Sequence, residues 1–98
     1  MTEQYDRIEP LIDMALDMRT ISNIKGSIDT IIAQHNDIDP YDIYVDVCER
    51  VKTMMTAAYK SNNRRCAEAY AKALMTVQHM AIDGLDDDKK IKFIADNL

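Results

Sequence analysis

Apolar side chains recur every three or four positions along almost the whole of this 98-residue chain, and this spacing limits the folds open to it. A period of 3.6 residues places apolar side chains on one face of a helix, whereas a half-buried strand would alternate every second residue. Only two glycines and two prolines occur, so the chain has few of the turn signals that many short strands need. The pattern predicts an all-α fold, a compact bundle of four main helices plus a short C-terminal helix.

The apolar face changes direction between the first two predicted helices. The face carried by residues 8–18 and the face that begins at Ile24 differ by more than about 90° around a common helix axis. One straight helix cannot bury both faces. We therefore expect a connection near Ser22 and Asn23, either of which can cap a helix.

Pro10 stands inside the first apolar stretch, where it removes a backbone donor. We expect an N-terminal turn followed by a helix from about Glu9 to about Ile21, with Pro10 at its first position; a helix kinked at Pro10 is the alternative. The second helix is expected from Ile24 to about Asn36, because its isoleucines keep a helical period.

The run Asp39-Pro40-Tyr41-Asp42 is the clearest local signal in the chain. An acidic cap, a proline at the first helical position and an acid in the first turn together predict the start of a third helix. Its expected apolar face is Ile43, Tyr44, Val47, Cys48, Val51, Met54, Met55 and Ala58.

Residues 60–63, Lys-Ser-Asn-Asn, predict a polar turn before a fourth helix over about 63–82. Because that helix is rich in alanine, which allows close approach of neighbours, we expect it to be the central one. Gly84 is expected to end it. A short last helix should follow the acids at 86–88, with an expected apolar face of Ile91, Ile94 and Leu98.

Length and composition predict a single helical domain over residues 1–98. With 47% hydrophobic and 30% charged residues the chain lacks the signature of disorder. Its start is polar and acidic, without the basic and apolar segments of a signal peptide, and no apolar run is long enough for a membrane span. The two cysteines show no disulfide framework, so we expect a cytoplasmic protein.

The sequence shows no pattern typical of an enzyme. Cys48, Cys66, His35 and His79 lack the close spacing of zinc ligands, and we expect structural or surface roles for them. The serines lie in capping or turn contexts, and neither glycine belongs to a phosphate-binding loop. We therefore expect no catalytic residues, no metal and no cofactor.

Charge is distributed unevenly along the chain. Residues 1–50 carry eleven acids and four bases, net −7; residues 51–82 carry one acid and five bases, net +4; the remaining residues are net −2. Since the overall net charge is −5, we expect no direct binding to nucleic acid, whose affinity for proteins depends on Lys and Arg.

The acids of the N-terminal half repeat every three or four residues and so form stripes on helices. We expect a small protein–protein interaction module, an adaptor or inhibitor that binds a larger partner with a basic surface. The stripes could imitate nucleic-acid phosphates, or they could be ordinary solvated faces. The alternative function is a structural subunit that self-associates as a homo-oligomer. The candidate partner-binding residues are Asp6, Glu9, Asp13, Asp17, Asp42, Asp46 and Glu49.

Overall fold

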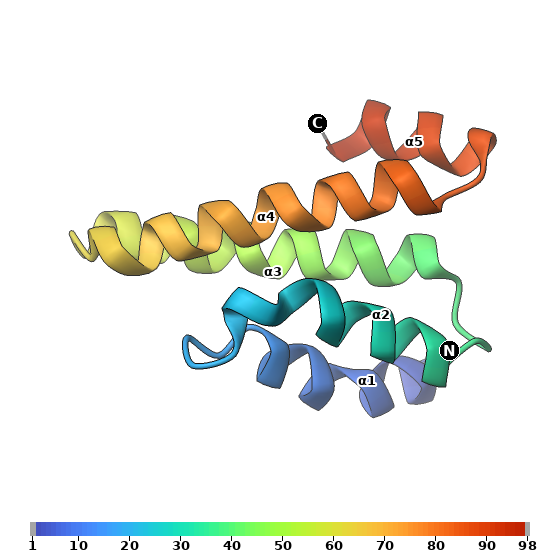
Figure 1. The fold of residues 1–98 in the computed structure, drawn as a ribbon, viewed down its shortest axis with the longest axis horizontal. Coiled ribbons are helices and arrows are strands. Elements are labelled where there is room, and N and C mark those ends of the chain that lie inside the picture. Colours follow the sequence, from blue (N-terminus) through green and yellow to red (C-terminus); the bar gives the residue numbers. More distant parts are fainter. Residues whose placement is uncertain (1, 98) are drawn as a thin grey trace.

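The computed structural model describes the backbone of residues 2–97 and the side chains of residues 7–97. Its helices are α1 (Thr2–Ala15), α2 (Ile24–Gln34), α3 (Pro40–Lys60), α4 (Arg64–Gly84) and α5 (Asp87–Asn97), with a 3₁₀ turn, η1 (Ile21–Asn23), before α2 (Figure 1). No strand occurs within residues 2–97. The predicted all-α bundle of four main helices plus a short C-terminal helix is confirmed.

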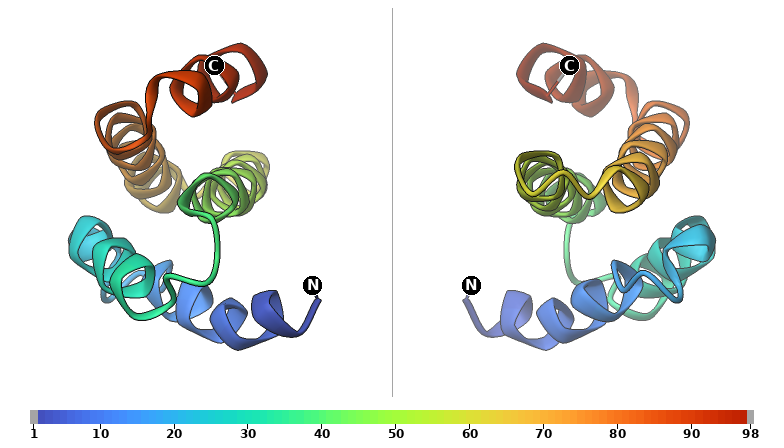
Figure 2. Two further views of the ribbon diagram at one scale, coloured as in Figure 1. Left: turned by 90° about the vertical axis from the view of Figure 1, so that its right-hand side faces the viewer. Right: turned by 90° about the vertical axis from the view of Figure 1, so that its left-hand side faces the viewer.

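The long helices α3 and α4 form an antiparallel hairpin in the middle of the molecule (Figure 1). Viewed end-on, α1 and α2 lie on one side of this α3–α4 hairpin and α5 lies on the other (Figure 2). Helix α4 contacts η1 and α2 as well as α3 and α5, so the alanine-rich helix is central, as expected. The Cα radius of gyration is 13.2 Å, typical of a folded chain of about 100 residues.

One apolar core connects all of these elements. Each fully buried isoleucine, valine or phenylalanine removes enough apolar surface from water to contribute roughly 1.5–3 kcal/mol. No polar or charged residue among residues 7–97 is buried in this core. The apolar faces predicted for the first three helices are in the main confirmed. The largest fully buried side chains are Ile8, Ile12, Leu16, Ile28, Ile43, Val47, Cys48, Val51, Val77 and Phe93.

The boundaries predicted around α3 are confirmed by their capping bonds. The Asp39 side chain accepts a hydrogen bond from the backbone N–H of Tyr41 at 2.9 Å, which satisfies a donor that the first helical turn leaves free. After Lys60, Asn62 adopts a left-handed φ of 60°, a conformation that asparagine tolerates better than most residues. The Asn63 side chain then accepts from the N–H of Cys66 and caps α4.

The predicted limits of the first helix are wrong. Helix α1 runs without interruption through Pro10 and ends at Ala15, rather than starting near Glu9 and continuing to Ile21. Pro10 is exposed, so water can reach the carbonyl that loses its helical donor. The early end has a local cause: Asp17 accepts from the N–H of Arg19, and the Thr20 hydroxyl donates to the carbonyl of Met14 at 2.7 Å. Such side-chain bonds compete with the helical ones.

The predicted apolar face of the last helix is also wrong. Helix α5 buries Phe93, whose ring meets Tyr41 edge-on with the centroids 6.4 Å apart. Ile91 and Ile94 instead remain 66% and 42% exposed, while Leu98 lies outside the described residues. A phenylalanine buries a large apolar area and gains from an edge-to-face aromatic partner, which the spacing within α5 alone does not reveal.

Candidate functional site: an acidic surface and an apolar groove

Arg50 of α3 holds together three of the seven candidate acids. Its guanidinium contacts Glu9 at 3.0 Å, Asp13 at 2.8 Å and Asp46 at 3.3 Å. Burial lowers the pKa of Arg50, but attraction to Asp46, Asp13 and Glu9 outweighs it, so the net shift is upward and the charge is retained. Two stripes predicted on separate helices therefore meet between α1 and α3.

The carboxylate of Asp46 is the most enclosed among the candidate acids of residues 7–97. Its Oδ1 accepts from Arg50, whereas its Oδ2 is buried and has no hydrogen-bond partner among the described residues. A buried charge is tolerated only when an opposite charge compensates it. Asp46 therefore has a structural role in this surface, and its enclosed carboxylate depends on the ion pair with Arg50.

The remaining candidate acids fall into three groups. Asp17 is neutralised locally by Arg19, whose hydrogen bonds lower the pKa of that carboxyl. Asp42 and Glu49 are exposed and form no ion pair with the side chains of residues 7–97. The Asp6 side chain lies outside the described residues. We define the acidic surface as Glu9 and Asp13 of α1 with Asp42, Asp46 and Glu49 of α3.

The charge pattern could have identified Arg50 only in part. It stands four residues after Asp46, the spacing at which opposite charges pair on a helix. Its contacts with Glu9 and Asp13 join α3 to α1, whose backbone packs mainly on α2, and no local spacing encodes them.

Acids in the α2–α3 connection are also engaged in structural contacts. Arg7 pairs with Asp37 at 2.6 Å, and Lys89 donates to Asp39 at 2.8 Å. The hydrogen bond from Lys89 and that from the N–H of Tyr41 hold the pKa of Asp39 below its ordinary value. These pairs connect α1 and α5 to the start of the hairpin, so they brace the fold.

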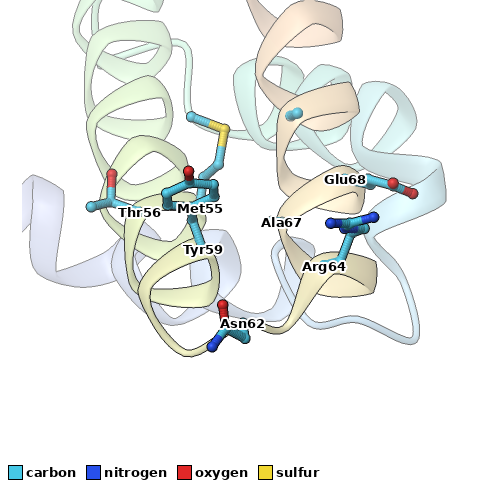
Figure 3. A pocket seen from close by; sticks show the side chains of 8 residues that line it. Met55, Thr56, Tyr59, Asn62, Arg64, Ala67 and Glu68 are labelled. Carbon is cyan, nitrogen blue, oxygen red and sulfur yellow. The ribbon is translucent and has the colours of Figure 1, made fainter.

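A second surface, which the sequence did not indicate, lies beside the α3–α4 turn (Figure 3). It is an open hollow of about 870 Å³ between the two helices, and Tyr59 at its edge is 77% exposed. Met55, which the sequence assigns to the apolar face of α3, packs against the core and also lines this hollow. We call it the α3–α4 groove and define it by Met55, Thr56, Tyr59, Asn62, Arg64, Ala67, Glu68 and Ala71.

The cysteines and histidines do not meet. Cys48 is fully buried, and burial raises its pKa to about 11, which disfavours the nucleophilic thiolate. Cys66 is half-buried on α4 and free. Within the described part of the chain, no group of three or more His, Cys, Asp or Glu side chains is placed to hold a metal ion.

Among the helices of the described residues, none combines the length and the apolar character needed to cross a bilayer. No protein-family model, no curated protein and no solved structure matches this chain.

Proposed function

We propose that this protein is a small interaction module, an adaptor or inhibitor that binds a larger protein through the acidic surface. The observation that supports the proposal best is the arrangement of three carboxylates, from two helices, around the single guanidinium of Arg50.

The acidic surface keeps an excess of negative charge. Three carboxylates share one guanidinium, and Asp42 and Glu49 add two further charges on α3. Contacts across α1 and α3 restrict the side chains before any partner binds, so less conformational entropy is lost on binding. A fixed negative field steers a basic protein surface and speeds its association.

The partner class follows from the same charges. Carboxylates one helical turn apart lie roughly 5–6 Å from each other, a coarse imitation of phosphates. A protein that binds nucleic acid through lysines and arginines is therefore one suitable partner, whereas nucleic acid itself would be repelled. Two free cysteines suit action in a reducing compartment, and we place the module in the cytoplasm.

The test compares two double variants as immobilised baits in lysate of the native host, with quantitative mass spectrometry as the readout. Asp42→Lys/Glu49→Lys reverses the two exposed acids of the surface and leaves the Arg50 contacts intact. Asp29→Lys/Asp83→Lys is the matched control, since it makes the same charge change at exposed acids of α2 and α4. The proposal expects a protein captured by the wild type and the control, and lost from the first variant.

Affinity for the captured partner should then fall steeply with salt, as expected of charge-driven association. Capture that survives Asp42→Lys/Glu49→Lys, or an affinity indifferent to salt, would show that the acidic surface is not the binding site.

A further inference from the structure

Two apolar surfaces of this molecule have no partner among the described residues. One is the α3–α4 groove, whose apolar lining includes Met55, Ala67 and Ala71. The other lies on the outer side of α5, where Ile91 and Ile94 are exposed. Asp87 stands one turn before Ile91, so the three share one helical face, which we call the α5 stripe.

The lengths of the helices explain why the groove is open. Helices α3 and α4 have 21 residues each, about 31 Å at 1.5 Å per residue, whereas α5 has 11, about 16 Å. Figure 1 shows α5 along the half of the hairpin that ends at Gly84. Near its end, the carbonyl of Asn97 accepts from Lys52 at 3.2 Å, close to the middle of α3. The uncovered half is thus about as long as another α5.

We propose that two copies of this chain pair about a two-fold axis, with the α5 stripe of each copy in the α3–α4 groove of the other. In each copy, α5 covers one half of the hairpin and rises one helix diameter above the uncovered half. A rotation by half a turn places α5 of each copy over the uncovered half of the other copy's hairpin, so both grooves are filled by one contact. Such an isologous contact is complete in a dimer and does not propagate.

The charges at the two surfaces agree with this pairing. Helix α5 begins beside Gly84, at the opposite end of the hairpin from the α3–α4 turn. The two-fold axis exchanges these ends, so the acidic start of the second copy's α5, with Asp87 and Asp88, lies over the turn of the first. That turn carries Lys60 and Arg64, against the single acid Glu68 of the groove. Opposite charges therefore meet at both ends of the dimer.

The groove and the α5 stripe share no residue with the acidic surface. Self-association on this face is accordingly independent of the proposed function, and a dimer would present two acidic surfaces.

The experiment measures the mass of the purified protein by sedimentation and by light scattering, from low to high micromolar concentration. The expected mass tends to twice the 11.2 kDa of one chain as concentration rises. Ile91→Glu/Ile94→Glu should weaken the dimer by more than about tenfold, because charges then enter an apolar groove. Met14→Glu on α1 is the control: Met14 is as exposed as Ile91 but lies outside the proposed contact.

Charge reversal tests the register. Arg64→Glu and Asp87→Lys should each weaken the dimer, and their combination should restore much of the lost affinity, since it re-forms the pair with exchanged signs. Circular dichroism shows whether each variant keeps its helices. A monomer at all concentrations, a dimer lost through Met14→Glu, or a combination no better than the weaker single variant would each overturn the proposal; a monomer would assign the groove to another occupant.

Discussion

The acidic surface and the α3–α4 groove differ in how far their side chains are already engaged. In the acidic surface, Arg50 restrains carboxylates of two helices before any partner arrives. In the groove, apolar side chains such as Met55 line an open hollow, and Tyr59 extends beside it. The first surface is held by charges that compensate each other, and the second is left open by a short helix. Removing one group should therefore affect stability at the first and mainly contacts at the second.

The largest effect on stability is expected from the core residue that docks α5 on the hairpin. Phe93→Ala removes the one side chain that α5 buries in the core, which should lower the free energy of unfolding by about 3 kcal/mol. Urea denaturation measures this loss. Ile91→Ala on the exposed side of the same helix is the control and should change stability by less than about 0.5 kcal/mol. Equal losses would show that α5 is docked by its other face.

Arg50→Met should reduce stability by about 2 kcal/mol, since it leaves Asp46 without its counter-charge; the usual cost of breaking a buried pair is larger, but Arg50 is 25% exposed. Arg50→Lys keeps the charge and loses the fork that reaches three carboxylates, so an intermediate loss is expected. Arg19→Met, at an exposed local pair, is the control. If Arg50→Met has the same free energy of unfolding as the wild type, the carboxylates are solvated separately. The acidic surface would then contribute no more to stability than the groove does.

A smaller effect concerns pH. Because Lys89 and the N–H of Tyr41 lower the pKa of Asp39, the folded protein releases this proton more readily than the unfolded chain. The resulting stability is present above the ordinary value of 3.8 and is lost as pH falls through the lower folded-state pKa. Asp39→Asn keeps a capping acceptor and removes the charge. It should cost less than about 1 kcal/mol at neutral pH, and the difference should shrink in acid. A pH-independent difference would show that the charge of Asp39 does not contribute to stability.

The smallest effect should touch neither surface. Gly26→Ala in α2 should stabilise by roughly 0.5 kcal/mol, because alanine favours a helix over glycine. Its Cβ would lie 2.9 Å from Oδ1 of Asn23, but that exposed side chain makes no capping bond and can rotate away. Thermal unfolding measures the gain, while partner binding and dimer mass should stay unchanged. Destabilisation would show that Asn23 cannot move.

The sequence was informative at most places where structure is decided within a few residues, although it missed the local bonds of Asp17 and Thr20 that end α1 early. Asp39 and Pro40 predicted the start of α3, and helical spacing predicted most of the core. It failed where distant contacts decide. The burial of Phe93 depends on Tyr41 from another helix, and the cluster around Arg50 depends on how α1 meets α3. The groove could not be predicted, because it results from the unequal lengths of α5 and the hairpin.

Charge spacing predicted which acids lie on the acidic surface better than it predicted which of them are paired with a base. Glu9, Asp13 and Asp46 do come together, but through a base that the stripes did not include. Asp17, which has the same spacing, turns out to stabilise the end of α1 with Arg19. Helical periodicity reports which residues share a face and does not report which of them are already paired.

Because Cys48 is buried, the modification of its thiol can serve as a probe of how often the core opens. A thiol-specific reagent can modify Cys66 while the fold is intact, whereas Cys48 must first leave the core and then lose its proton. The rate at which Cys48 is modified under native conditions would therefore report how often the core opens around it, with Cys66 as the reference for reagent access.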